Sequence, residues 1–186
     1  MGKIFESIDD RVAAFIRAQH VFFVATAPLA ADGHVNLSPK GLGSFAILSP
    51  GRVAYLDLVG SGAETIAHAR ENGRIVFMFC AFDGPPRIVR LHGRARAVEP
   101  GDSDFEEFVA SFDPAPNTRA IIVADIERVA DSCGYGVPLL RFEAERDQLT
   151  RWAERKGPDD VADYQLENNL ESLDGLPALR AEKLRT

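Results

Sequence analysis

The stretch VAYLDLVGSGAETIAHARENGRIVFMFC, from Val53 to Cys80, decides the fold. An apolar segment enters a Gly-Ser-Gly turn, a short helical pattern follows, Gly73 ends it, and a second apolar segment leaves. The pattern predicts a strand–turn–helix–strand unit with a polar corner at 60–65. Corners of this kind, held between rigid elements, are places where a scaffold presents a binding site.

The corner has a specific chemistry. Ser61 and Glu64 have the Ser-x-x-Glu spacing of a capping box, so Ser61 is predicted to cap the helix and Glu64 to fold back onto the cap. Glu64 also places negative charge at the helix N-terminus, where it repels a phosphate. We therefore expect the corner to offer hydrogen bonds to a ligand. In the preceding strand, Asp57 shares a face with Tyr55, and a buried aspartate needs a partner.

Upstream, the segment HVNLSPKG at 34–41 is a candidate anion clamp. Ser38 offers a hydroxyl group, Lys40 an ammonium group, and Gly41 allows close approach of the backbone. The alternative is a solvated turn, because Ser-Pro-Lys-Gly is also good turn chemistry. Lys40 is the only lysine between Lys3 and Lys156, which favours the clamp.

The remaining N-terminal segments complete the predicted sheet. Ser7 and Asp10 resemble a capping box, and the helical spacing that follows predicts a helix over 8–19. The segments at 21–27 and 34–37 read as a hairpin, and another apolar run covers 45–48.

Downstream, PRIVRLHGRARAV at 86–98 is a strand with two different faces. Alternation places on one face Val89, Leu91, Ala95 and Ala97, and on the other Arg90, His92, Arg94 and Arg96. The basic face is either an exposed surface or an anion site, since a row of cations needs solvent or an anion. Arg87 lies beside the preceding turn on the apolar side and is placed to reach a site at the strand's end.

The C-terminal third changes character. Asp102 or Ser103 is predicted to cap a helix through Phe112, and a strand follows at 119–129. Tyr135, between two glycines, indicates either a sharp turn or contact with a flat ligand or partner subunit. Beyond Leu140 the sequence becomes helical, with helices before and after Gly157-Pro158. We predict a barrel domain at 1–140 and a helical extension at 141–186, packed on the barrel or on the partner subunit.

Composition limits the classes of function. With 186 residues, 46% of them hydrophobic and 26% charged, the chain is predicted to be one soluble domain without a membrane helix. A net charge of −7 opposes nucleic-acid binding. The two cysteines, without a CxxC pair, fit a reducing, cytoplasmic location. The four histidines lack metal-ligand spacing, and no common nucleotide fingerprint or GxSxG elbow occurs, so no metal site is expected.

Several strings, in this order, resemble the pyridoxamine 5′-phosphate oxidase-like flavoproteins. They are HVNLSPKG (34–41), YLDLVGSGAETIAHARENGRIVFMF (55–79), PPRIVRLHGRARAV (85–98), CGYGVP (133–138) and SLDGLP (172–177). The resemblance implies a mostly β fold with peripheral helices, a Greek-key split β-barrel of the FMN-binding type. It also implies a homodimer with FMN at the interface and a small-molecule substrate.

The resemblance assigns roles to residues of this chain. It places Asn36 near the flavin ring and Ser38, Lys40 and Gly41 nearer the ribityl phosphate. The family commonly has Ser-x-Lys at the start of the helix, whereas this chain has Glu64 there, so Arg87 and Arg90 are the expected substitutes. The segments at 133–138 and 172–177 are expected to reach the other subunit's site. The complete set of expected cofactor contacts is Asn36, Ser38, Lys40, Gly41, Asp57, Ser61, Gly62, Glu64, Thr65, Arg87, Arg90 and Tyr135.

The function expected from the sequence is that of an FMN-binding oxidoreductase. The flavin N5 needs no protein base, which agrees with the lack of any catalytic constellation. The tail does not supply the basic and aromatic residues that grip the substrate phosphate in the enzyme that names the family, so vitamin B6 oxidation is not predicted. The alternatives are a non-catalytic protein that binds haem or a deazaflavin, with His68 or His92 as haem ligand, and a dimer that has lost its cofactor, which Glu64 favours.

Overall fold

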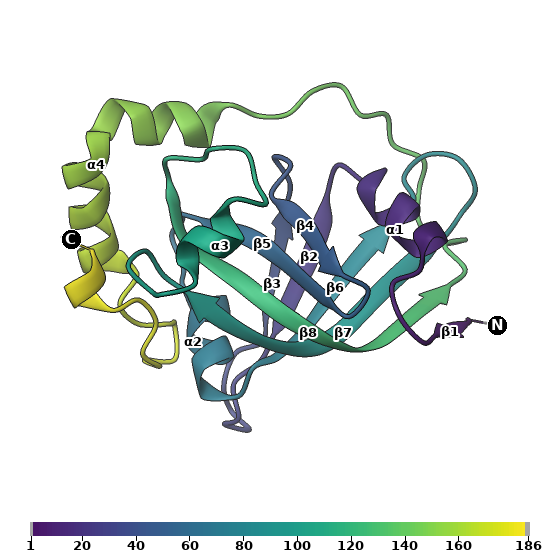
Figure 1. Ribbon diagram of the computed structural model, residues 1–186, viewed down its shortest axis with the longest axis horizontal. Coiled ribbons are helices and arrows are strands. Elements are labelled where there is room, and N and C mark those ends of the chain that lie inside the picture. Colours follow the sequence, from purple (N-terminus) through teal and green to yellow (C-terminus); the bar gives the residue numbers. More distant parts are fainter. Residues whose placement is uncertain (1, 185–186) are drawn as a thin grey trace.

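The structure is a computed structural model and describes residues 2–184. Its main element is an eight-stranded antiparallel sheet with the order β3-β2-β6-β7-β8-β5-β4, while β1 pairs with β8 beside this path. Figure 1 shows the long strands β7 and β8 crossing the others, with α4 and the C-terminal tail on one side and α1 and the N-terminus on the other. The predicted mostly β fold with peripheral helices is confirmed.

The elements follow the predicted order. The strands are β1 (Ile4–Phe5), β2 (Phe22–Thr26), β3 (Asn36–Lys40), β4 (Phe45–Ser49), β5 (Arg52–Leu58), β6 (Arg74–Cys80), β7 (Ile88–Val98) and β8 (Thr118–Ser132). The helices are α1 (Asp10–Arg17), α2 (Glu64–Glu71), α3 (Phe105–Val109) and α4 (Gln148–Asn168), followed by the 3-10 turn η1 (Ala181–Lys183).

The unit β5–α2–β6 forms as the sequence predicts, but it joins distant parts of the sheet. β5 pairs with β4 and β8, whereas β6 pairs with β2 and β7. Helix α2 therefore crosses the sheet and lies against β7, β2 and β6. Gly73 has φ +72°, the left-handed conformation expected of a glycine that ends a helix.

The sheet encloses an aromatic core. The Phe22 ring meets Phe45 edge-on at a centroid distance of 5.0 Å, and Tyr55 at 5.7 Å. Phe77 and Phe79 complete the cluster and are almost completely buried. Edge-to-face pairs of this kind stabilise a core beyond the area that they bury.

The helix starts differ from the sequence prediction. Asp9, not Ser7, caps α1 by accepting a 2.8 Å hydrogen bond from the backbone N–H of Val12, and the helix is shorter than predicted at both ends. Helix α3 begins after Asp104 and ends at Val109. Asp102 does not cap it, because its carboxylate accepts a hydrogen bond from the backbone of Glu99 and pairs with Arg180.

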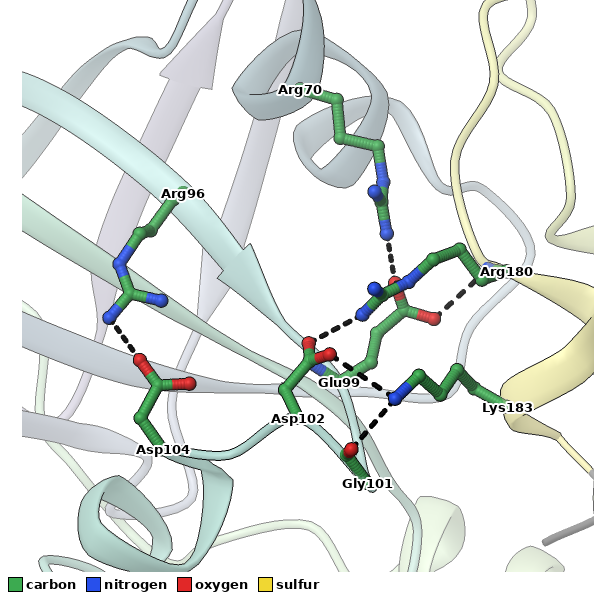
Figure 2. A network of polar contacts seen from close by, with 8 residues as sticks. All are labelled: Arg70, Arg96, Glu99, Gly101, Asp102, Asp104, Arg180 and Lys183. Atoms are coloured by element: carbon green, nitrogen blue, oxygen red, sulfur yellow. Dashed lines mark hydrogen bonds and ion pairs between the residues drawn. The ribbon is translucent and has the colours of Figure 1, made fainter.

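The tail after α4 packs on its own barrel. Gly157 has non-helical φ and ψ and separates α4 into two parts, as the Gly157-Pro158 pair predicts. Figure 2 shows that Glu99, directly after β7, forms ion pairs with Arg70 from α2 and Arg180 from the tail. Glu99 is fully buried, so its carboxylate has lost its hydration, and the two arginines offset the cost of that desolvation.

Candidate cofactor site

The row of polar side chains on β3 faces the barrel. Asn36, Ser38 and Lys40 pair in register with Thr26, Val24 and Phe22 of β2, which are all buried. Because side chains alternate along a strand, the three β3 residues share the inward side. The segment is therefore a strand up to Lys40, and the alternative of a solvated turn is wrong for these residues.

The Lys40 side chain forms an ion pair with a buried carboxylate. Its Nζ lies 2.9 Å from Asp57 Oδ1, and Arg119 Nε lies 2.9 Å from the other oxygen, Oδ2. The side chains of Asp57 and Arg119 are 1% and 4% exposed, while that of Lys40 is 22% exposed. Burial raises the pKa of Asp57, but Arg119 and Lys40 outweigh burial and hold this pKa below its usual value.

Lys40, Asp57 and Arg119 form an ion triad that carries a net positive charge. Two cations share one carboxylate, so one net positive charge remains, and it lies nearest to solvent at Lys40. The Lys40 ammonium has three N–H donors, of which one is directed at Asp57. An anion that approaches the end of β3 therefore meets a cation held in place by two buried partners.

The polar corner is fixed by contacts from distant segments. The Gly60 carbonyl accepts a 3.0 Å hydrogen bond from the Asn169 side chain and lies 3.5 Å from Arg119 Nη1. The predicted capping box is wrong: Ala63 occupies the N-cap position, no side chain caps α2, and Ser61 is exposed. The Glu64 carboxylate instead lies against Gly62, where a Cβ would collide with it.

A chain of hydrogen bonds connects α2 to the β2–β3 hairpin. Asn36 Nδ2 donates to Thr26 Oγ1 at 3.1 Å and to Thr65 Oγ1 at 3.0 Å, and Ser38 Oγ donates to Asn36 Oδ1 at 3.0 Å. Thr26 Oγ1 lies 2.8 Å from Nδ1 of His68, one helical turn after Thr65. Thr26, Thr65 and His68 are buried, so the hydrogen bonds that hold Asn36 in position come from the interior of the protein.

The structure does not bring the expected arginines to Lys40. Arg87 pairs with Asp131 at 3.2 Å and lies over the rings of Phe5 and Phe15. Arg90 lies on the outer face of β7, bonded to Ser132, whereas Lys40 faces inward. The predicted division of β7 into two faces is correct, and this division is what separates Arg90 from the site. Tyr135 is 83% exposed on the segment after β8.

The histidines do not favour a haem site. His68 is fully buried and its Nδ1 is bonded to Thr26, so a haem iron has no approach to it. His92 is on the outer face of β7, and burial and the neighbouring Arg128 and Arg90 lower its pKa. Among the described residues no group of three His, Cys, Asp or Glu side chains has the arrangement of a metal site.

Two adjoining cavities lie beyond the Lys40 end of β3, and a third shares Gly43 and Ser44 with the smaller of them. The larger, of about 780 Å³, is lined by the end of α1, Phe82 and the segment Leu139–Phe142. The smaller, of about 380 Å³, includes Gly41, Gly43 and Ser44 and shares Gln19 and His20 with the larger. Of the predicted cofactor contacts only Gly41 lines either cavity, whereas Asn36, Ser38 and Lys40 are half-buried on the inward side of β3.

Sequence reasoning missed Arg119, Thr26 and Asn169, and it named His68 only as a possible haem ligand. For Arg119 a signal existed, because a buried Asp57 requires a cation and Arg119 is the charged residue at the start of an apolar strand. The other three carry no local signal, since each acts through a contact with a segment far away in the sequence.

Comparison of solved structures shows the fold. A candidate pyridoxamine 5′-phosphate oxidase from Lactobacillus delbrueckii superposes with a TM-score of 0.51 at 18% identity, covering 68% of this chain and 98% of that one. A single-residue variant of the HupZ protein of Group A Streptococcus gives 0.52 at 20% identity, covering 67% and 99%. These likenesses confirm the predicted split-barrel fold.

Comparison of sequences shows the family. The pyridoxamine 5′-phosphate oxidase profile matches residues 8–133, more than half of the chain. The pyridoxamine 5′-phosphate oxidase family protein ustO of Aspergillus flavus is 41% identical over 200 residues, which cover 97% of this chain and 79% of that protein. None of the helices within residues 2–184 is both long and apolar enough to cross a membrane. The chain belongs to the pyridoxamine 5′-phosphate oxidase family.

Proposed function

We propose that this protein is an FMN-dependent oxidoreductase in which FMN lies along the inward row of β3. Lys40 would hold the phosphate, and Asn36 would lie near the ring. The observation that carries the proposal is the row itself: three polar side chains on one strand face, ending in an ion triad with one net positive charge. Family membership supports it, since the family takes its name from an oxidase.

The residues present fit a ligand with one phosphate group. Lys40 supplies the charge, Gly41 lets the backbone approach, and Asp57 and Arg119 hold the Lys40 ammonium in place. Neither Arg87 nor Arg90 adds a second cation from the same chain, because each is held elsewhere. The Glu64 carboxylate, beside Gly62, opposes any further negative charge at the corner.

FMN supplies the hydride and electron chemistry when bound, and the protein binds and orients it. Lys40 neutralises the phosphate, while Asn36 and Ser38 offer hydrogen-bonding atoms along the ligand. Both cysteines are free, which fits the reducing cytoplasm as the compartment in which this protein works.

Direct titration with FMN tests the proposal. Replacing Lys40 by Ala removes the net charge of the triad, so FMN is expected to bind about 10 to 100 times more weakly, as a charge-assisted hydrogen bond implies. Riboflavin, which lacks the phosphate, is expected to lose little. Flavin fluorescence and absorbance give both affinities. Lys156→Ala, the same change on α4, is the control and leaves both affinities unchanged.

Three results contradict the proposal. The first is protein that is colourless as purified and stays without a flavin spectrum after incubation with FMN and desalting. The second is an equal loss of FMN and riboflavin affinity in Lys40→Ala. The third is tighter binding of a deazaflavin or of haem than of FMN.

We further propose that the cofactor-binding form is a homodimer joined through the outer face of β3, β2 and β6. The register places Leu37, Ala25 and Val76 in one row, and Pro39, Phe23 and Met78 in the next. These apolar side chains are partly exposed, and Leu37 is 64% exposed. Apolar patches of this kind mark protein interfaces, and a second copy brings an identical apolar face.

Light scattering after gel filtration tests the dimer. Leu37→Glu places a charge within the proposed interface and is expected to give a monomer. Leu37→Val keeps the apolar character and leaves the dimer intact. A monomeric natural protein, or a Leu37→Glu variant that stays dimeric, overturns this interface.

A further inference from the structure

We infer that the β2–β3 loop and the C-terminal tail form a pH-sensitive latch, in which the Asp174 carboxylate holds His34 while His34 is protonated. The ion pair is lost when the imidazole gives up its proton. His34 lies two residues before β3, and Asp174 lies in the motif SLDGLP of the tail, 140 positions further along the chain. The latch is a property of the chain itself, so it holds whether or not the proposed cofactor binds.

Asp174 binds His34 through both of its carboxylate oxygens. Oδ2 accepts a 2.8 Å hydrogen bond from the backbone N–H of His34, and Oδ1 lies 2.6 Å from the ring Nδ1. The side chain of His34 is 69% exposed and that of Asp174 is 19% exposed. The imidazole therefore exchanges its proton with solvent, while the carboxylate is mostly shielded. A Cβ on Gly33 would lie 3.2 Å from Oδ2, so the loop backbone approaches this carboxylate closely.

A closed turn holds the Asp174 carboxylate in position. The backbone N–H of Ser172 donates to the carbonyl of Leu176, and that of Gly175 donates to the carbonyl of Ser172, each at 2.9 Å. Ser172 Oγ also accepts a 3.1 Å hydrogen bond from the backbone N–H of Leu176. Because the turn is already closed by these bonds, little chain entropy is lost when Asp174 binds His34. In the single chain, the motif at 172–177 therefore contacts its own β2–β3 loop.

The other end of the loop is anchored without a histidine. The backbone N–H of Leu29 donates to Glu71 Oε2 at 2.8 Å, and Arg74 Nη2 donates to the carbonyl of Pro28 at 2.9 Å. Glu71 is the last residue of α2 and Arg74 is the first residue of β6. A change in the protonation of His34 therefore leaves this end in place and affects the end of the loop beside β3.

The charges around the pair favour its ionised form. The hydrogen bond to Asp174 and the charge of that carboxylate raise the pKa of His34, and Asp32 of the same loop adds to this effect. In turn, the side-chain and backbone hydrogen bonds from His34 lower the pKa of Asp174, and the charges of His34 and of His68 on α2 lower it further.

The two shifts define the pH window in which the latch is closed. The folded-state pKa of His34 lies above its ordinary value of about 6.5, so its contribution is full below that value and is lost as the pH rises through the higher one. The pKa of Asp174 lies below its ordinary value of about 3.9, so its contribution is present above that value and is lost as the pH falls through the lower one. The latch is therefore closed in mildly acidic solution and weakens in alkaline solution, where the backbone hydrogen bond of His34 remains.

The first experiment titrates His34 by NMR spectroscopy in the whole protein. The pKa of His34 is expected to lie above its ordinary value and to fall in Asp174→Asn, which keeps the shape of the side chain and removes its charge. Glu182→Gln changes an exposed acidic residue of the same tail and is the control, which leaves this pKa unchanged. A His34 pKa at or below the ordinary value, or one that Asp174→Asn does not lower, overturns the inference.

The second experiment measures the opening by hydrogen exchange, with rates corrected for the pH dependence of free amides. From pH 6 to pH 8.5, the protection of the His34 amide is expected to fall about two- to fivefold, the range of an exposed ion pair. The Leu29 amide, bonded to Glu71, is the internal control and keeps its protection. In His34→Gln, the amide at position 34 is expected to show the lower protection at both pH values.

Two results of the exchange experiment overturn the latch. One is an equal pH dependence of the amides at positions 29 and 34, and the other is a pH dependence at position 34 that persists in His34→Gln. Neither experiment uses a cofactor, so both outcomes are independent of whether the protein binds FMN.

Discussion

At the scale of single residues, the candidate site depends on Asp57, whose carboxylate is completely buried. It is tolerated because cations from β3 and β8 reach its two oxygens. The same contacts that stabilise the carboxylate also fix Lys40. Stability and ligand binding are therefore coupled at this residue, and a change at Arg119 affects both.

Arg119→Met tests this coupling. Removing one partner leaves Asp57 buried beside Lys40 alone, and breaking a buried pair costs about 3 to 5 kcal/mol of unfolding free energy. Arg52→Met is the control, because Arg52 pairs with Asp125 on the same two strands while both side chains are about half exposed or more. That pair is worth about 0 to 1 kcal/mol. Urea unfolding of both variants gives the comparison, and equal losses would show that burial of Asp57 is not what matters.

The sequence predicts that Asp57 needs a partner but does not identify it. Asp57 and Arg119 are 62 positions apart, and the register of β5 against β8 shifts between Asp57 and Leu58. A shift of one residue moves a side chain to the other face of a sheet, so only the folded register places Arg119 beside Asp57. Lys40, in contrast, was predicted as a site residue because it is a rare lysine within a distinctive motif.

At the scale of elements, the helix ends show where local patterns fail. Both predicted capping boxes are wrong, at Ser7 and at Ser61, although the helices that follow are present. At α2 the reason is visible, since Asn169 and Arg119 hold the Gly60 carbonyl and thereby set the turn. Side-chain caps contribute about 1 kcal/mol, which distant contacts can exceed. Strand positions were predicted better, because alternation follows directly from burial.

At the scale of elements we predict the stability cost of replacing Gly73, which follows the end of α2. Gly73→Ala must adopt φ near +72°, and its Cβ would lie 3.0 Å from the carbonyl oxygen of Ala95. Gly43, with φ +64° and open space around it, is the control. Gly43→Ala is expected to cost about 1 to 2 kcal/mol for the left-handed conformation alone. Gly73→Ala is expected to cost more, as measured by thermal unfolding, and an equal cost contradicts the role of the close contact.

At the scale of the whole molecule, the tail is part of the barrel's charge balance. Arg180 reaches both Glu99 and Asp102, and Lys183 donates to the carbonyl of Gly101, as Figure 2 shows. Glu99 also receives Arg70, so one carboxylate ties α2, β7 and the tail together. The sequence predicts a helical extension but not this attachment, because nothing local marks Arg180 as different from other arginines of the tail.

Arg180→Ala is expected to lower the free energy of unfolding by about 1.5 to 3 kcal/mol, the contribution of a hydrogen bond to a charged group. It is also expected to speed hydrogen exchange at residues 176–184. Arg151→Ala, which removes an exposed pair with Asp147 on α4, is the control and changes neither quantity. If both variants behave alike, the tail is not held through Glu99.

The attachment of the tail to Glu99 affects how the nascent chain folds while the ribosome synthesises it. Glu99 and Arg180 are separated by 81 positions. At 5 to 20 residues per second, roughly 4 to 16 s pass between the synthesis of one and the other. During that interval the barrel strands can form, but the buried carboxylate has only Arg70 as a cationic partner. The nascent barrel therefore reaches its full stability only after the tail has left the ribosome.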